Sequence, residues 1–123
     1  MVKVVFCVRK RPEMSDEEFH RYWLEEHGPL VRDKAAALGI VRYVQTHKIE
    51  TPANEAMRAS RGAAEPYDGI AEVWWDSVEA MAAATATPEG REAGRALLED
   101  ERRFIDLARS ALWVAEEHEI VAP

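Results

Sequence analysis

The sequence contains a single cysteine, Cys7, so no disulfide can form within the chain. Its apolar runs are far shorter than the roughly 20 residues that a membrane-spanning helix needs. Lys3, Arg9 and Lys10 also interrupt the first apolar stretch, which argues against a secretory signal peptide. We therefore expect a cytoplasmic protein that does not contact a membrane.

Positive charge is also scarce. The chain has 16 Lys and Arg residues against 23 Asp and Glu residues, a formal net charge of −7, and such a surface repels the phosphates of nucleic acids. There is no glycine-rich phosphate loop, no Cys or His pair at zinc-binding spacing and no serine in a nucleophile elbow. The sequence therefore predicts neither a nucleic-acid partner nor a metal or other cofactor.

What is present is an ordinary globular composition. Hydrophobic residues make up 47% of the 123 residues and charged residues 32%. This length predicts one domain over residues 1–123. A domain this small buries a limited share of its surface, so a partner subunit would add stability.

The hydropathy pattern predicts the order strand, helix, strand, strand, helix, strand. Strands are expected over 2–9, 40–49, 67–75 and 112–121. Helices are expected over 15–39, from residue 77, and over 87–107. This order is the split βαβ pair of an α+β ferredoxin-like sandwich. Its helices cover one sheet face, and we expect a second copy of the chain to cover the other.

Local signals mark where these elements begin and end. Ser15 is typical of a helix N-cap, with Glu18 completing a capping box. Pro29 predicts a break or kink next to Gly28. The segment 50–66 is rich in small and charged residues, which predicts a long loop, either a functional flap or lid or a mobile surface loop.

His27 is the most informative polar residue. At about 100° per residue it shares a helical arc with Phe19 and Trp23, so its ring should face the sheet. A helix end before Gly28 favours the charged ring, and burial favours the neutral one. A histidine between these effects can transfer protons near neutral pH. The alternative is a structural histidine bonded to a carbonyl beside the break.

Strand residues supply the other candidates. Glu72 sits between apolar neighbours, where a carboxylate needs a cationic partner or a raised pKa; the alternative is a side chain solvated at an edge or in an interface. Tyr43, Gln45 and His47 alternate on one strand face, and the Tyr43 hydroxyl could orient a ligand. Trp23 and Trp74, two of the four tryptophans, would serve as apolar walls of a pocket.

These motifs together resemble the EthD family. The resemblance rests on the first strand, the aromatic-rich helix that ends in His-Gly-Pro, and the later strands, which are residues 2–6, 11–15, 18–31, 42–47, 67–74 and 116–118. It covers nearly the whole chain. It implies a dimeric α+β barrel, in which two ferredoxin-like units pack sheet to sheet and each has a pocket between its sheet and helices.

The resemblance also implies a site. Methylmuconolactone isomerases are more distant relatives that need no cofactor, and their pocket histidine and a tyrosine correspond in position to His27 and Tyr43. The cysteine of their site falls at Val73 here, so this chain lacks it. The methylisomerase reaction itself is therefore not expected, whereas the general site is.

We therefore expect an acid/base enzyme without cofactor, of isomerase, dehydratase or cyclase type. Its substrate would be a small apolar oxygenated molecule, such as an aromatic or polyketide-like lactone or ketone. His27, Tyr43 and Glu72 would be catalytic, and Trp23, Gln45, His47 and Trp74 would bind substrate. The alternatives are an oxidoreductase or its accessory protein, either a cofactor-free monooxygenase or a haem protein with His27 as ligand, and a non-catalytic small-molecule binder.

Overall fold

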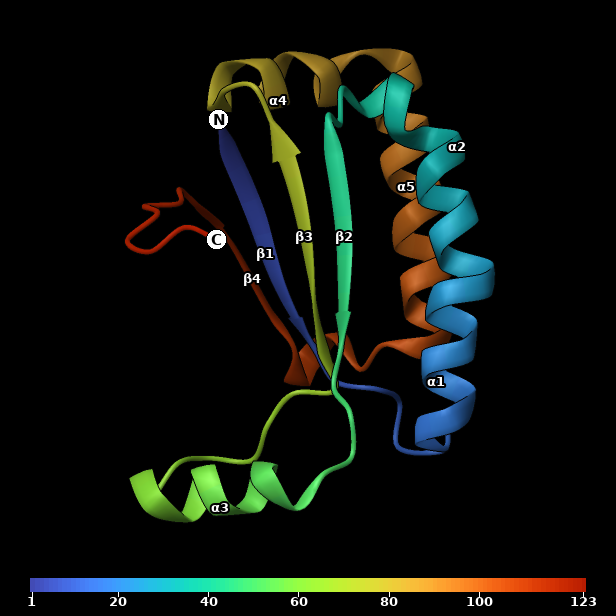
Figure 1. Ribbon diagram of the computed structural model, residues 1–123. Coiled ribbons are helices and arrows are strands. Elements are labelled where there is room, and N and C mark those ends of the chain that lie inside the picture. Colours follow the sequence, from blue (N-terminus) through green and yellow to red (C-terminus); the bar gives the residue numbers. More distant parts are fainter.

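A computed structural model describes all residues from Met1 to Pro123. Its strands are β1 (Val2–Val8), β2 (Arg42–His47), β3 (Gly69–Trp75) and β4 (Ala111–Ala115). Its α-helices are α1 (Asp16–Tyr22), α2 (Gly28–Leu38), α3 (Pro52–Arg61), α4 (Val78–Ala86) and α5 (Pro88–Phe104). A π-helical turn, Trp23–His27, joins α1 to α2, and a 3-10 turn, Leu107–Arg109, precedes β4 (Figure 1).

The four strands form one antiparallel sheet in the order β2-β3-β1-β4. The helices α1, α2 and α5 lie together on one side of this sheet (Figure 1). This arrangement confirms the predicted ferredoxin-like α+β class. None of the helices combines the length and the apolar character needed to cross a membrane.

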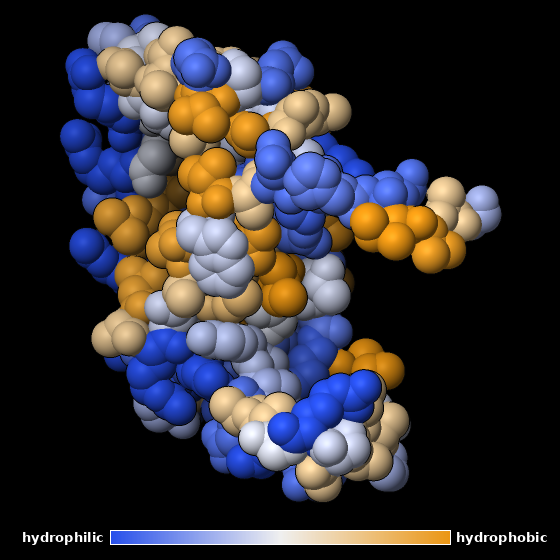
Figure 2. Space-filling view, turned by 90° about the vertical axis from the view of Figure 1, so that its left-hand side faces the viewer, coloured by the Kyte–Doolittle hydropathy of each residue, from blue (hydrophilic) through white to orange (hydrophobic).

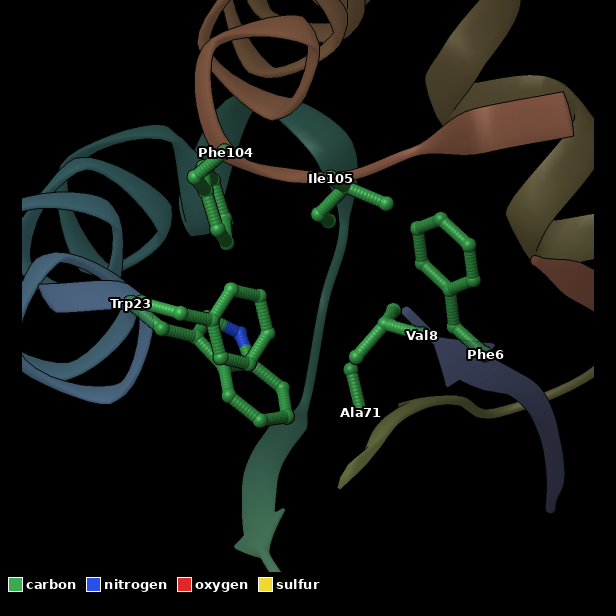
Figure 3. Close-up of a cluster of buried hydrophobic side chains, with 7 residues drawn as sticks. Phe6, Val8, Trp23, Ala71, Phe104 and Ile105 are labelled. Carbon is green, nitrogen blue, oxygen red and sulfur yellow. The ribbon is translucent and has the colours of Figure 1, made fainter. Parts of the chain in front are cut away.

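The core lies between the sheet and these helices. Alternate residues of β1 and β3 point to the helices, so Val8 and Ala71 meet the fully buried rings of Trp23 and Phe104 (Figure 3). Phe104 ends α5 and Trp23 begins the π-helical turn, so the core fixes the point at which both helices approach the sheet.

The opposite sheet face has no helix over it. It carries the other residues of each strand, among them Val5 of β1, Glu72 of β3 and Trp113 of β4, which lie side by side in the strand register. Trp113 is half exposed. Seen from the side away from the helices, apolar side chains gather over the middle of the molecule (Figure 2). We call this surface the open sheet face.

The first helical region begins as predicted and does not break. The Ser15 hydroxyl accepts the Glu18 backbone N–H at 3.1 Å, so the predicted cap is present. Gly28, however, keeps right-handed helical angles, and the predicted break is wrong. The chain instead widens into the π-helical turn, which accommodates the missing N–H and the bulky ring of Pro29 without leaving the helical conformation.

Two other boundaries differ from the prediction. The expected loop over 50–66 contains helix α3, whose N-cap is Thr51 and which has no buried residue. The expected last strand over 112–121 ends at Ala115, because Ala115 already pairs with Lys3 close to the start of β1. The acidic residues that follow have no strand left to pair with. Similarly, the last helix ends at Phe104, and residue 107 lies in the separate 3-10 turn.

The contact between β3 and the π-helical turn can be tested at Gly69. A Cβ atom there would lie 2.5 Å from both the Thr46 carbonyl oxygen and the buried Trp23 ring. We expect Gly69→Ala to lower the free energy of unfolding by about 1–3 kcal/mol, measured by chemical denaturation. Gly94→Ala is the control, because its Cβ would meet only Leu38, at 4.0 Å. It should leave stability unchanged or raise it by about 0.5–1 kcal/mol. Equal stability of the two variants would contradict the packing.

Candidate functional site

A cavity of about 270 Å³ lies between the helices and the sheet. Its sheet wall is apolar, with residues such as Val4 and Phe6 of β1 and Val73 of β3. Leu98 and Leu112, which are 38% and 61% exposed, lie at its rim. No lysine or arginine lines it, and its polar side chains are His27, Tyr43, Thr85 and Glu101. The cavity therefore suits an apolar molecule with a few polar atoms.

His27 ends the π-helical turn, and its ring is 96% buried, with only 4% of the residue exposed. The Nδ1 atom lies 2.7 Å from Oδ2 of Asp100 on α5. An ionised carboxylate can only accept, so Nδ1 carries the proton and donates it. The ring also packs against Phe104, with centroids 5.0 Å apart. Asp100 and Phe104 together fix both the tautomer and the orientation of the ring.

The second nitrogen of His27, Nε2, is free for chemistry. It makes no hydrogen bond within the chain, and the chain has no buried side-chain nitrogen or oxygen without a partner. Nε2 is therefore accessible from the cavity that the ring lines. Burial lowers the pKa of His27 below its ordinary value of 6.5, and Asp100 opposes part of this shift. The ring is thus neutral at pH 7, with an unprotonated nitrogen open to the cavity.

Asp100 is itself held by a second partner. Its Oδ1 accepts a hydrogen bond from the Tyr22 hydroxyl, and its Oδ2 accepts from His27. Burial raises the pKa of Tyr22, and so does its bond to Asp100. Tyr22 therefore stays a neutral donor. Asp100 bridges α1 and the π-helical turn, and both of its oxygens are committed to positioning.

Tyr43 on β2 lines the same cavity. The Gln45 amide nitrogen donates to the Tyr43 oxygen at 3.1 Å and to the Trp23 carbonyl at 2.8 Å. The Trp23 carbonyl only accepts, which fixes the orientation of the amide. The Tyr43 oxygen is thus an acceptor from Gln45, and its own proton is left to donate to a ligand. Burial raises the pKa of Tyr43, so the hydroxyl keeps that proton at neutral pH.

The hydrogen bonds continue from Gln45 to two histidines. His47 Nε2 donates to the Gln45 oxygen at 2.7 Å, and the Nδ1 atoms of His47 and His20 lie 2.8 Å apart. His47 then accepts at Nδ1, and His20 donates. Burial lowers the pKa of both rings, and His20 adds to the effect on His47. His47 also stacks on Trp23, with centroids 4.4 Å apart.

Glu101 also reaches the cavity, from α5. Burial raises its pKa to about 7, and the charge of Asp100 adds to the shift. No hydrogen bond or ion pair joins its carboxyl to another group of the chain. Glu101 therefore differs from Asp100, which lies next to it in sequence and is fully paired.

The structure brings most of the sequence candidates together but not all. His27, Tyr43 and Trp23 line the cavity, and Gln45 and His47 form the polar network behind Tyr43. Glu72 and Trp74 lie on the open sheet face, because the adjacent residues of β3 point to the helices. Glu72 and Trp74, expected as catalytic and substrate-binding residues, therefore do not line the cavity with His27.

Glu72 and Trp74 each have charged partners on the open sheet face. Glu72 is paired with Lys3 of β1, the cationic partner that its strand position required. The Trp74 indole N–H donates to Glu117 at 2.9 Å, and the Arg42 guanidinium lies 4.5 Å from the Trp74 ring centre.

Sequence reasoning missed Asp100 and Glu101. Both read as part of the charged run 99–103, yet Glu101 follows Leu97 by four residues and precedes Phe104 by three. This spacing places Glu101 on the buried arc of α5. The helical spacing of the sequence therefore already indicated that Glu101 faces inward. No cluster of three His, Cys, Asp or Glu side chains is arranged to hold a metal ion.

Comparison with known proteins now identifies the family. The model of the EthD domain family matches residues 11–108. This chain belongs to the EthD domain family. The matched range contains every group that has been described at the cavity, from Trp23 to Glu101 on α5, apart from the β1 and β4 walls.

Solved structures agree with this EthD-domain fold. An ethyl tert-butyl ether D (EthD) family protein from Bacillus halodurans C-125 is 22% identical, with a TM-score of 0.63 over 96% of this chain and 99% of that one. A putative antibiotic biosynthesis monooxygenase from Deinococcus radiodurans is 15% identical, with a TM-score of 0.53 over 100% and 98%. A dimeric ferredoxin-like protein from Thermobifida fusca YX is 14% identical, with a TM-score of 0.56 over 93% and 88%.

The His27–Asp100 pair gives this EthD-domain protein a measurable signature. We expect the pKa of His27, followed by NMR of the imidazole nitrogens, to lie below 6.5. Asp100→Asn keeps an oxygen that accepts from Nδ1 but removes the charge, so the pKa should fall further. Glu99→Gln removes an exposed charge from the same helix and should leave the pKa unchanged. A rise of the pKa in Asp100→Asn would contradict the assigned contact.

Proposed function

We propose that this protein is a cofactor-free acid/base enzyme for a small, largely apolar molecule with a carbonyl group. An aromatic or polyketide-like lactone or ketone is a suitable substrate. The proposal rests on one observation above all: His27 opens Nε2 onto an apolar cavity while Asp100 holds Nδ1 at 2.7 Å. A neutral imidazole positioned in this way is a general base.

In the proposed reaction, His27 Nε2 removes a proton from the carbon next to the carbonyl. Negative charge then develops on the carbonyl oxygen, and the Tyr43 hydroxyl donates to it. Asp100 stabilises the imidazolium that forms. Return of the proton from His27 to another carbon completes an isomerisation. If a hydroxyl group on the next carbon leaves instead, it takes this proton and departs as water, which is a dehydration. If the enolate carbon attacks a second carbonyl of the molecule, the new alkoxide takes the proton, which is a cyclisation.

The other candidates have supporting roles in this proposal. Trp23 forms a wall of the cavity and, through its carbonyl, holds Gln45. Gln45 and His47 orient the Tyr43 hydroxyl. We assign Glu72 and Trp74 to the open sheet face, away from the reacting atoms.

A cofactor-free monooxygenase is the second candidate, because the fold relative from Deinococcus radiodurans is named a putative antibiotic biosynthesis monooxygenase. The same base would form a carbanion, and O₂ would then add to it, so oxygen consumption distinguishes the two reactions. A haem protein fits poorly, because no lysine or arginine lines the cavity to pair with haem propionates. A non-catalytic binder would bind the molecule and show no turnover.

We also propose a homodimer that works in the cytoplasm. The fold relative from Thermobifida fusca is described as dimeric, and the open sheet face exposes apolar side chains such as Trp113. A partner sheet packed against this face would bury them and enclose the Lys3–Glu72 ion pair. The unpaired Cys7 is in keeping with a reducing compartment.

The base can be tested before the natural substrate is known. Deuterium exchange next to the carbonyl of a panel of ketones and lactones, followed by proton NMR in D₂O, measures proton removal directly. His27→Asn should reduce the exchange rate by about 10²–10⁴-fold while the melting temperature shows that the fold is kept. His118→Asn, at an exposed position, is the control. Equal rates in both variants would contradict the role of His27.

The dimer is tested by light scattering at micromolar concentration. The expected mass is twice the chain mass of 13.9 kDa. Trp113→Glu places a charge on the open sheet face and should shift the mass towards that of one chain. Met57→Glu makes the same change on α3, where Met57 is also exposed, and should leave the dimer intact. A mass of 13.9 kDa for the unaltered protein would refute the dimer.

A further inference from the structure

Glu101 lies where a negative charge is hard to maintain. It sits on the buried arc of α5 and lines the cavity with His27 and Tyr43. Burial is the main cause of the raised pKa of Tyr43, and the charge of ionised Glu101 adds to it, so the two side chains are close enough to interact. Three groups that can exchange or share a proton therefore meet in a cavity whose walls are otherwise almost entirely apolar.

The carboxyl of Glu101 has no partner in the chain. No cation, hydroxyl or backbone N–H within the protein donates to it, although the chain leaves no buried side-chain oxygen without a partner. Its oxygens are therefore accessible, and the residue lines the cavity. A structural carboxylate at such a place would be paired, as Asp100 is with His27 and Tyr22.

The charged and titratable groups around Glu101 favour its protonated form. Asp100 lies beside it on α5, His27 approaches from the π-helical turn and Tyr43 from β2. The strands β1, β3 and β4 contribute only apolar side chains to the cavity. Burial and the charge of Asp100 thus hold the pKa of Glu101 at about 7. A carboxyl group that keeps its proton near neutral pH can donate a hydrogen bond.

We infer that Glu101 is a catalytic hydrogen-bond donor, which binds the carbonyl oxygen of the substrate together with Tyr43 while His27 removes the proton. This inference rests on the proposed function and names the substrate class. The substrate is an uncharged carbonyl compound that forms an enolate.

The proton transfer balances within these groups. The electrons of the broken C–H bond form the C=C bond of the enolate, and the negative charge comes to the oxygen. The proton goes to His27 Nε2, which later returns it to carbon. Tyr43 and Glu101 keep their protons and share them with the oxygen in short hydrogen bonds. No oxidant or cofactor enters this step.

The same residues exclude a charged reacting group. A substrate carboxylate at this position would be desolvated without a lysine or arginine, since none lines the cavity. An enolate is different, because its charge exists only during the reaction and two neutral donors meet it. The arrangement therefore favours a negative charge that forms in the transition state over one that the substrate already carries when it binds.

Binding of 4-nitrophenol tests the pair of donors without turnover, because its phenolate resembles an enolate on a flat ring. The absorbance of the phenolate reports binding. Glu101→Gln keeps a donor and should keep the affinity, whereas Glu101→Leu should lower it by about tenfold or more. Glu99→Gln is the control on the outer side of α5. No saturable binding by the unaltered protein, or equal binding by both Glu101 variants, overturns the inference.

Rates of deuterium exchange then show whether Glu101 acts as a hydrogen-bond donor or as a base. Glu101→Leu should slow deuterium exchange by about 10²–10³-fold, and Glu101→Gln should keep most of the rate. The unaltered protein should lose activity as pH rises through about 7, and Glu101→Gln should not. Equal losses in the two variants would make Glu101 a base and overturn the inference. Absence of exchange together with the expected phenol binding would refute the proposed function and leave the donor pair supported.

Discussion

The π-helical turn Trp23–His27 holds the site in its shape. In an α-helix the ring of Pro29 would clash with the carbonyl four residues earlier, and the wider turn removes that clash. The Trp23 carbonyl then accepts the N–H of Gly28 and also the side-chain amide of Gln45 at 2.8 Å. One carbonyl oxygen therefore connects the helical turn that carries His27 to the strand that carries Tyr43, and these two side chains keep a fixed relation.

Burial affects the acidic and basic groups at the cavity in opposite directions. It lowers the pKa of His27 and raises that of Glu101, so each favours its neutral form. Asp100 is the negative charge that remains, and two donors solvate it. Asp100 therefore stabilises a positive charge on His27, whereas a negative charge in the cavity can be stabilised only by neutral donors such as the Tyr43 hydroxyl.

The periodicity of the sequence predicted the fold and the inward direction of His27, because both follow from local spacing. It did not decide which face of β3 the helices cover, since Ile70 and Trp74 are as apolar as Ala71 and Trp75. The sequence therefore could not separate Glu72 from the residues around His27. Helix α3 was missed because Met57 is its only large apolar residue, although Thr51 and Gly62 cap its two ends. The contact of Asp100 with His27 depends on helix packing 73 residues apart, which no local pattern contains.

The division of the cavity between its two layers has a consequence for evolution. The titratable groups at the cavity come from the helical layer and from the edge strand β2, whereas β1, β3 and β4 supply aliphatic and aromatic walls such as Val4, Phe6 and Val73. Substitutions among these wall residues change the size and shape of the cavity without touching the hydrogen bonds of His27 or Tyr43. The shape of the cavity can therefore change in descendants by small steps in the sheet while the arrangement of the polar groups is inherited unchanged.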